Sequence, residues 1–410
     1  MGPITLFDKS FLQSLSIDEA VWFDHFFLTN IAPIFFVETL ADLEKAVRAR
    51  RLPEDEVGII ADKTPQLHPH SNMFHWDICI NNLLGHNIPM EHGQVLLAGG
   101  RVVKTADQTG IIFEFPPELE AFSRWRDREF LNVERLFAKR WRQVSNTFDF
   151  EEILRGIHSI GISIQNCNSL EQVKAVADEI INTGGYSLDR MKLLFTALKI
   201  PENLFYSVWQ RWGFSGFPSL KQFLSYTAYL LSVEVFYCIA VEKNLVSIKD
   251  RIDATYLFYL PFCMMFVSSD HFHRRCAPLF LRDNQSFIWG QDLKADLRNI
   301  DTYYDMLPDI DKEKGLFKIA AWPPQEKDFL TSRLYDRFLP KWRNLSKQNI
   351  NLTEETQDHI VQHIHSFSEA RALKPEEVDF DMKRTDALIL KTKVHRKRGK
   401  WWQIPRDLPD

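Results

Sequence analysis

Short apolar runs alternate with longer amphipathic stretches along the chain, a pattern typical of α/β proteins. One apolar run over residues 3–8 ends at Asp8, and another over 263–269 stops just before Asp270. We predict a strand at each run and a further strand at 286–289. In an open α/β sheet, functional groups gather outside the carboxyl ends of the strands. The two aspartates are therefore expected at one shared edge of the sheet.

Helical patterns account for most of the remaining residues. Ser16 followed by Glu19 forms a capping box at the start of one helix. Pro33 stands at the expected N1 position of the next helix, which should continue to about residue 51. Additional helices are predicted at 117–146, 169–182, 187–198, 201–212, 218–243 and 250–262, and additional strands at 94–98 and 110–115.

The composition is that of a folded protein with a substantial core. The chain has 410 residues, of which 45% are hydrophobic and 32 are Phe, which is enough for two or three domains. Its 50 basic and 55 acidic side chains give a net charge of −5, which excludes a generally basic protein that coats nucleic acid. Any site for a polyanion must therefore be local.

The cysteines and the apolar stretches indicate a cytoplasmic protein. The cysteines show no C-x-x-C spacing and several have apolar neighbours, as expected for reduced thiols. The N-terminus lacks the pattern of a secretory signal. The most apolar stretches, 227–241 and 254–269, contain Glu234 and Pro261 and are shorter than the roughly 20 apolar residues of a membrane span. We expect both stretches in the core and no contact with a membrane.

Four acidic residues stand where position and context agree. Asp8 and Asp270 end strands, and Asp253 lies on the helix that leads into the second of these strands. Glu38 lies in the most apolar part of its helix, where a lone carboxylate is costly to bury. Because Asp is also a preferred capping residue, each of the three aspartates can instead be interpreted as a helix cap. Asp250, on the same helical face as Asp253, is an alternative to it.

These residues, in this order, resemble the PIN-domain nuclease family. The motifs that carry the resemblance are Asp8-x-Ser10 after the first strand, the helical Glu38, Asp253 on a late helix, and Ser268-x-Asp270 at the end of the second strand. The resemblance implies a three-layer α/β/α fold with a parallel central sheet. It also implies that the four acids hold Mg²⁺ or Mn²⁺ and hydrolyse RNA, less often DNA. Ser10 and Ser268 would contact the substrate or support the metal ligands.

Carboxylates suit that chemistry for a physical reason. Mg²⁺ takes oxygen ligands and keeps several waters, which leaves room for a phosphate and a nucleophile. One metal ion lowers the pKa of an attacking water, and another neutralises the leaving oxyanion. Four basic residues follow Asp270 closely: His271, His273, Arg274 and Arg275. They either bind phosphates of the substrate or form a solvated first turn of a helix.

The resemblance covers 1–60 and 220–300, because a long segment separates Glu38 from Asp253. We therefore predict a discontinuous nuclease domain interrupted by a mainly helical insertion over 61–219, which caps or selects the substrate. A C-terminal extension occupies 301–410. By architectural analogy, such an insertion also permits a toxin-like or host-defence role in which cleavage waits for a signal.

The C-terminal extension contains a basic segment with two aromatic rings. Its members are Lys391, Lys393, Arg396, Lys397, Arg398, Lys400, Trp401 and Trp402. Cations and aromatic faces together suit single-stranded nucleic acid, through neutralised phosphates and stacked bases. A solvated tail without a partner is the alternative interpretation.

A group of histidines near residue 80 does not indicate zinc. It comprises His68, His70, His75, His86 and His92, together with Cys79. Structural zinc sites use paired Cys and paired His ligands, and His70 and His75 meet only the histidine half of that pattern. We interpret the segment as a polar, partly buried loop that lines the substrate path.

The sequence therefore predicts a metal-dependent nuclease, and first of all an endoribonuclease. The alternative is a non-catalytic protein of the same fold, whose insertion and tail bind nucleic acid or a protein partner. A regulatory protein and a second copy of the chain are both compatible with that role. The complete set of four acids favours the enzyme, since a scaffold has no need to keep them all.

Overall fold

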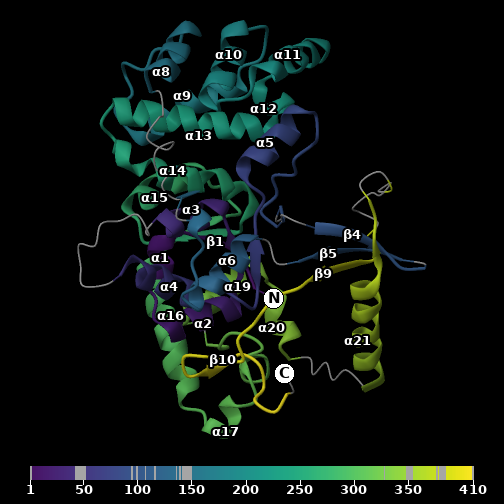
Figure 1. Cartoon of the computed structure of the whole chain (residues 1–410). Helices are drawn as coiled ribbons and strands as arrows, with labels where there is room; N and C mark the ends of the chain where they lie inside the picture. Colours follow the sequence, from purple (N-terminus) through teal and green to yellow (C-terminus); the bar gives the residue numbers. More distant parts are fainter. Residues whose placement is uncertain are drawn as a thin grey trace.

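A five-stranded parallel sheet lies at the centre of the computed structural model, with helices packed on its faces (Figure 1). The structure describes residues 2–408 except 42–51, 94–95, 98–99, 107, 115–116, 135, 138–139, 141–149, 327, 348–353, 375–376 and 378–384. The sheet has the order β3-β2-β1-β6-β7. Its strands are β1 (Ile4–Phe7), β2 (Leu28–Ile31), β3 (Pro69–Ser71), β6 (Met265–Ser268) and β7 (Ser286–Trp289). This arrangement confirms the predicted three-layer α/β/α fold with a parallel sheet.

The two central strands are the apolar runs that end in the acidic motifs. Every residue of β1 and β6 is buried, as expected for parallel strands that are covered on both faces. β1 pairs with β2 on one side and with β6 on the other. Phe7 lies opposite Val267 in this register. Asp8 and Ser268 therefore reach the same carboxyl edge of the sheet.

Two of the helices around the sheet begin where the sequence predicts. Both hydrogen bonds of the capping box between Ser16 and Glu19 are present, and Pro33 occupies N1 of its helix. That helix ends at Leu40, and the rest of its predicted length lies outside the described residues. The helices of this part are α1 (Lys9–Ser14), α2 (Ile17–Phe26), α3 (Pro33–Leu40), α4 (Pro53–Lys63), α14 (Arg251–Tyr256), η4 (Leu257–Phe262), α15 (His271–Cys276) and α16 (Gly290–Asp305).

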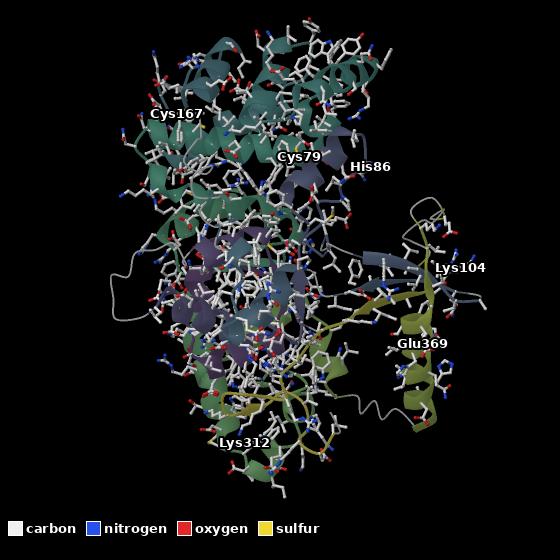
Figure 2. All side chains as sticks on the ribbon, viewed as in Figure 1. Cys79, His86, Lys104, Cys167, Lys312 and Glu369 are labelled. Carbon is white, nitrogen blue, oxygen red and sulfur yellow. The ribbon has the colours of Figure 1, made fainter. Side chains whose placement is uncertain are left out.

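A helical lobe stands at one end of the sheet (Figure 1). Its helices are α5 (His75–Leu83), α8 (Phe150–Ser159), α9 (Leu170–Asn182), α10 (Leu188–Ala197), α11 (Phe205–Phe214), α12 (Leu220–Phe223) and α13 (Ser225–Glu242). Most residues of α13 are buried, so this apolar stretch belongs to the core as predicted. In the described part of the chain, no helix combines the length and apolar character needed to cross a membrane. All five cysteines are buried and none forms a disulfide; Cys79 and Cys167 lie in this lobe (Figure 2).

Two boundaries differ from the prediction, and a third prediction falls largely outside the described residues. β3 lies beyond residue 60 and still belongs to the central sheet, so the first segment of that domain extends further than expected. The helix predicted over 117–146 ends at Arg126, because Arg128 adopts a left-handed backbone conformation with φ 62°. The strand predicted over 94–98 lies largely outside the described residues; Leu97 forms an isolated bridge with Asn72, and the next described strand, β4, begins at Gly100.

A second, smaller sheet joins the insertion to the C-terminal extension. It has the order β8-β4-β5-β9 and packs against α21 through Phe367, which is in contact with Val103 and Ile112. The elements are β4 (Gly100–Lys104), β5 (Thr109–Phe113), α21 (Glu354–Glu369), β8 (Arg371–Ala372) and β9 (Ala387–Leu390). Figure 1 shows this unit beside the main body. The extension also contains α17 (Asp309–Lys312), α18 (Leu316–Ile319), α19 (Leu330–Phe338), α20 (Trp342–Leu345) and the hairpin of β10 (Lys397–Arg398) and β11 (Trp401–Trp402).

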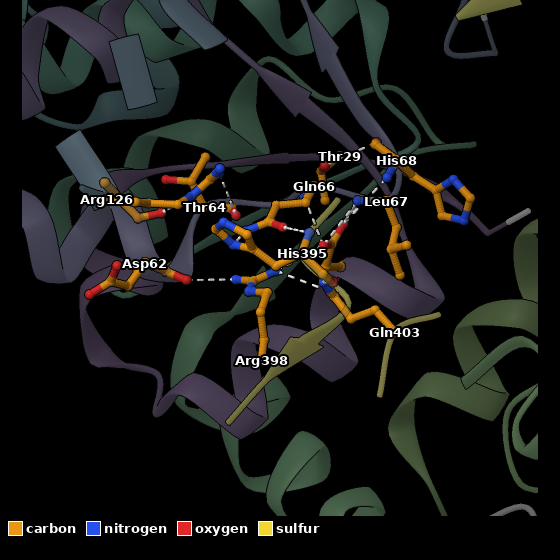
Figure 3. A network of polar contacts seen from close by, with 12 residues as sticks. Thr29, Asp62, Thr64, Gln66, Leu67, His68, Arg126, His395, Arg398 and Gln403 are labelled. Atoms are coloured by element: carbon orange, nitrogen blue, oxygen red, sulfur yellow. Dashed lines mark hydrogen bonds and ion pairs between the residues drawn. The ribbon is translucent and has the colours of Figure 1, made fainter. Parts of the chain in front are cut away.

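A buried ion pair fastens this hairpin to the main body (Figure 3). Arg398 donates to Asp24 at 3.0 Å and to the backbone oxygen of Asp62 at 2.8 Å. Asp24 also accepts backbone N–H groups of residues 66–68, immediately before β3. The hairpin is therefore held at the amino edge of the sheet, opposite the edge where the acidic motifs lie.

The same contacts correct the interpretation of the basic tail. Arg398 is buried, and Trp401 packs on Trp22 with 4.7 Å between the ring centroids. The predicted contact of Arg398 and Trp401 with nucleic acid is therefore wrong, because both side chains serve the fold. Lys400 pairs with Asp301 at 2.9 Å. Contact with nucleic acid remains a prediction for Lys391, Lys393, Arg396, Lys397 and Trp402, which are exposed or half-buried.

We predict that Arg398→Ala lowers the free energy of unfolding by about 3–5 kcal/mol, because Asp24 would stay buried without its cation. Chemical denaturation of the purified variant measures this loss. Arg406→Ala is the matched control, since its ion pair with Glu313 is largely exposed and should contribute little. Equal losses in the two variants would show that the buried pair does not hold the hairpin.

Candidate active site

Asp8 lies at the centre of the site, directly after β1. It is 2% exposed, and its Oδ1 accepts the backbone N–H of Phe11 at 3.0 Å, which caps α1. Its Oδ2 accepts hydroxyl groups from Ser10 at 2.6 Å and from Ser268 at 2.8 Å. The two predicted motifs, Asp-x-Ser and Ser-x-Asp, therefore converge on one carboxylate.

His273 is the buried counter-ion of Asp8. Its Nδ1 lies 3.3 Å from Asp8 Oδ2 and 2.8 Å from Ser268 Oγ, and its Nε2 lies 2.9 Å from the backbone oxygen of Asp253. Burial alone would lower the pKa of His273, but the hydrogen bond and charge of Asp8 raise it to about 9. Burial conversely favours a raised pKa for Asp8, but His273 together with the hydrogen bonds of Ser10 and Phe11 outweighs it, so the pKa of Asp8 is lowered. The pair is therefore ionised at neutral pH.

Glu38 is also held by groups of the protein. It lies half-buried on α3, and the hydroxyl of Tyr256 donates to its Oε2 at 2.7 Å. Lys9 Nζ lies 3.4 Å from Glu38 Oε1. Glu38 is thus a paired carboxylate at the same edge of the sheet, which explains how its apolar helix can carry it.

Asp253 interacts with all three other acids. It lies half-buried within α14, where burial raises its pKa to about 7. The charge of His273 opposes this shift, whereas Glu38, Asp270 and Asp8 reinforce it. The other three acids therefore all lie near enough to Asp253 for their charges to act on it, and we call these four residues the acidic cluster.

The capping interpretations hold for two of the three aspartates. Asp8 caps α1, and Asp270 caps α15 by accepting the backbone N–H of Phe272 at 2.6 Å. For Asp253 the capping interpretation is wrong, because the N-cap of its helix is Asp250. The carboxylate of Asp250 accepts the backbone N–H of Ser247 at 3.0 Å. The structure therefore favours Asp253 over Asp250 as the member of the cluster.

The predicted substrate contacts divide into an inner and an outer set. Ser268 and His273 are fully buried. The prediction that they contact the substrate directly is therefore wrong, and both side chains bind Asp8 instead. Ser10 donates to Asp8 and accepts the backbone N–H of Ser269 at 3.2 Å, which ties the two motif loops together. The inner set thus orients the first carboxylate.

The outer set lies on the surface of α15. His271 and Arg274 are exposed beside Trp289, with the Arg274 guanidinium 4.8 Å from the ring centroid. Arg275 donates to the backbone oxygen of Leu245 at 2.9 Å. His271 and Arg274, together with the indole of Trp289, therefore form an exposed basic and aromatic rim next to Asp270.

Sequence reasoning missed Lys9 and Tyr256. Lys9 follows Asp8 directly in the chain, which was a signal that the sequence offered, but its burial is known only from the structure. Tyr256 is one helical turn from Asp253, but nothing in the sequence shows that its hydroxyl reaches Glu38, which is 218 positions away. Such long-range pairs follow only from the fold.

The histidines near residue 80 point to separate partners. The ring of His70 contacts the backbone oxygen of His68, His75 bonds to Tyr259, and Asn284 contacts His92. Burial raises the pKa of the Cys79 thiol to about 11, which keeps it protonated. Among the residues that the structure describes, no three His, Cys, Asp or Glu side chains stand in an arrangement that could hold a metal ion.

The acidic cluster nevertheless fits Mg²⁺ or Mn²⁺ by the chemistry of its donors. All four side chains offer carboxylate oxygens, the ligands that these hard cations prefer. Burial and, to a smaller extent, the charges of the other three acids raise the pKa of Asp253, and a divalent cation would relieve the repulsion between these acids. In the described arrangement the oxygens of Asp8 and Glu38 are instead bound by His273 and Lys9. A metal ion would have to compete with these internal cations.

Comparisons with protein-family models, with curated proteins and with solved structures found no match to this chain. The resemblance to PIN domains therefore rests on the motifs and their order along the chain. The functional argument rests on the geometry of the acidic cluster and of the surfaces around it.

We predict that the stabilisation contributed by His273 disappears as the pH rises. The raised pKa means that this contribution is fully present below about pH 6.5 and is lost as the pH passes through about 9. The free energy of unfolding of the wild type should therefore exceed that of His273→Asn by on the order of 3 kcal/mol more at pH 6 than at pH 10. Urea denaturation in EDTA measures this difference.

The control for this experiment is His86→Asn, which alters an exposed histidine. Its effect on the free energy of unfolding should be small and the same at both pH values. A difference between wild type and His273→Asn that does not change from pH 6 to pH 10 would mean that His273 is neutral in the folded protein.

Proposed function

We propose that the protein is a metal-dependent nuclease that hydrolyses phosphodiester bonds, and that its substrate is RNA. The observation that supports this most is the convergence of Asp8, Glu38, Asp253 and Asp270 on one acidic cluster at the carboxyl edge of a parallel sheet. Active sites of open α/β folds lie at this edge. The order of the strands and of the four acids also agrees with the PIN-domain resemblance.

Each residue of the cluster has a defined part in this proposal. Asp8, Glu38, Asp253 and Asp270 would hold Mg²⁺ or Mn²⁺, which lowers the pKa of a bound water and neutralises the phosphate when present. Ser10, Ser268 and His273 keep Asp8 in one orientation. Lys9 and Tyr256 do the same for Glu38.

Asp253 is the candidate for proton transfer in the cluster. A carboxyl group whose pKa lies near 7 can take a proton from an attacking water at neutral pH and release it afterwards. Burial sets this raised pKa first of all, and the charges of the other three acids and of His273 modify it. A metal ion would lower it, so the free protein and the loaded protein should titrate differently.

The surroundings suit a polyanionic strand despite the net negative charge. His271, Arg274 and Trp289 line the exposed rim, where cations can contact phosphates and an indole can stack on a base. The helical lobe stands at the end of the sheet near α14 and α15 (Figure 1). This position supports a role of the insertion in selecting the substrate, and it is compatible with a toxin-like or host-defence activity.

A specific observation favours a second candidate, a non-catalytic protein of the same fold. His273 and Lys9 already neutralise Asp8 and Glu38 without any metal ion. A scaffold that kept these acids for stability would have such pairs. In that case nucleic acid or a protein partner would bind without being cleaved.

We predict that end-labelled single-stranded RNA is cleaved in Mn²⁺ or Mg²⁺ but not in EDTA, and that the double variant Asp8→Asn, Asp270→Asn is inactive. Asp253→Asn should reduce the rate by about 10²–10⁴-fold, the usual contribution of a general acid or base. Single-stranded DNA is tested in parallel. Asp250→Asn, which changes the helix cap beside the cluster, should retain cleavage.

Equal activity of the wild type and the double variant would assign the cleavage to a contaminant and sink the proposal. If both are inactive while circular dichroism shows both to be folded, the scaffold becomes the better explanation.

We also predict that millimolar Mn²⁺ or Mg²⁺ stabilises the wild type against unfolding. Binding to the folded state alone adds about 2.7 kcal/mol when the ion is present at 100 times its Kd. Thermal denaturation at constant ionic strength measures the shift of the Tm. The double variant Asp8→Asn, Asp270→Asn should show no shift, and an unchanged Tm of the wild type would argue against a metal site.

A further inference from the structure

A cavity of about 340 Å³ lies beside the helices that carry Glu38 and Asp253. Its walls come from the core helices α3 and α14 and from the lobe helices α5, α10 and α13. Ile34, in its wall, is one helical turn before Glu38. Ile252 and Thr255 lie on either side of Asp253 along α14. The volume falls within the range of about 300–1,000 Å³ that is typical of small-molecule sites.

The apolar walls of this cavity suit a flat ring. Phe74, Trp76 and Phe258 line it together with aliphatic side chains such as Leu198 and Leu230. Trp76 is half-buried, and it makes no ring contact with another aromatic side chain among the described residues. Aromatic rings pack well against one another in offset or edge-to-face arrangements, so these walls favour a ligand with an aromatic body.

The carboxylate in the wall is already neutralised within the protein. Glu234 is 3% exposed, its Oε1 accepts Arg251 Nη2 at 2.6 Å, and its Oε2 is fully buried. Among the described residues that line the cavity, Glu234 is the only acid, whereas both Arg251 and Lys199 are cations. The wall therefore holds two cations for one acid, and a bound ligand meets a net positive charge.

His75 adds a neutral N–H donor to the wall. The hydroxyl of buried Tyr259 accepts the backbone N–H of His75 at 3.0 Å and lies 3.1 Å from His75 Nδ1. Because His75 is the only partner of this hydroxyl among the described residues, the hydroxyl donates its own hydrogen to Nδ1. Burial and the charge of Arg251 lower the pKa of His75 to about 3, so the ring is neutral and its proton is on Nε2.

This N–H group is open to the cavity. His75 forms part of the cavity wall, and its Nε2 is bonded to no described residue and is not fully buried. A donor in such a place is available to a ligand that brings an acceptor.

The polar groups of the wall are neighbours. Arg251 is bonded to Glu234, and its charge also acts on His75. Lys199 lies near enough to Glu234 for its charge to act on that carboxylate. The cavity therefore combines aromatic walls with a group of N–H donors and positive charge. A small aromatic carboxylate has the matching parts, which are a flat apolar ring and negatively charged acceptor oxygens.

We propose that this cavity binds a small aromatic carboxylate. The ring packs against Trp76 and Phe258, while the carboxylate accepts the Nε2–H of His75 and faces the charge of Lys199. An amine of similar shape would bring its cation to a positive wall, and an uncharged ring would leave the N–H of His75 without an acceptor. Binding does not rest on the proposed nuclease function, since it uses no residue of the acidic cluster.

Isothermal titration calorimetry with the full chain in EDTA tests the proposal, with indole-3-acetate as the probe. Indole-3-acetamide keeps the ring without the charge, tryptamine carries an ammonium in place of the carboxylate, and acetate lacks the ring. Indole-3-acetate should bind about tenfold or more tightly than each of the three. A hydrogen bond to a charged group and the burial of a ring are each worth at least this factor.

Two variants test the polar contacts. His75→Phe keeps a ring in the wall but removes the donor, and it should weaken the binding of indole-3-acetate about tenfold. Lys199→Gln alters an exposed side chain and should weaken it about two- to fivefold without changing the binding of indole-3-acetamide. Lys192→Gln is the matched control, because it removes the same charge from an exposed position on α10 outside the cavity and should bind like the wild type.

A further variant covers the case in which His75→Phe does not fold. Ala197→Leu adds bulk to the cavity wall and should weaken the binding of both indole-3-acetate and indole-3-acetamide. No binding of indole-3-acetate, equal affinity for the acid, the amide and the amine, or unchanged affinity in Ala197→Leu would overturn the proposal. Equal weakening in Lys199→Gln and Lys192→Gln would overturn it as well.

The double variant Asp8→Asn, Asp270→Asn separates this proposal from the nuclease function. It should bind indole-3-acetate with the affinity of the wild type, because neither residue lines the cavity. A failure of the nuclease proposal therefore leaves this result unaffected.

Discussion

The cost of burying the carboxylate of Asp8 shapes the whole carboxyl edge of the sheet. A buried charge is tolerated only when it is paired and fully hydrogen-bonded. Ser10, Ser268 and His273 meet this need, and they come from α1, the end of β6 and α15. His273 in turn contacts the backbone of Asp253 on α14. The side chains that stabilise buried Asp8 therefore also connect the elements that carry Asp253 and Asp270. The candidate site thus contributes to the stability of the fold as well.

The molecule uses the same physical device at the opposite edge of its sheet. There Asp24 and Arg398 form a second buried ion pair that joins the N-terminal part of the chain to the C-terminal hairpin. Gly399, with φ 54°, makes the tight turn between the two strands of that hairpin. At the amino edge, the ion pair attaches the C-terminal hairpin to the N-terminal part of the chain. At the carboxyl edge, the paired groups hold the acidic residues of the candidate site.

The sequence predicted what depends on local pattern and order. The strands before Asp8 and Asp270 and the capping box at Ser16 are short-range features, so apolar runs and spacing reveal them. The pairing partners in the site are long-range contacts, which no local pattern encodes. β3 was missed because it has only three residues and begins with a proline. In the tail, composition showed cations and rings, but it did not show that Arg398 and Trp401 are buried.

The order of the strands has a consequence for the synthesis of the protein. β1 leaves the ribosome well before its neighbour β6, because the Ser268 hydroxyl that binds Asp8 is 260 positions downstream. At a translation rate of about 5–20 residues per second, this delay is on the order of tens of seconds. Until then Asp8 lacks two of its partners, and the cluster lacks Asp253 and Asp270. A nascent chain therefore carries no assembled acidic site before Asp270 and His273 have been translated, and any catalytic activity of that site begins only after this point.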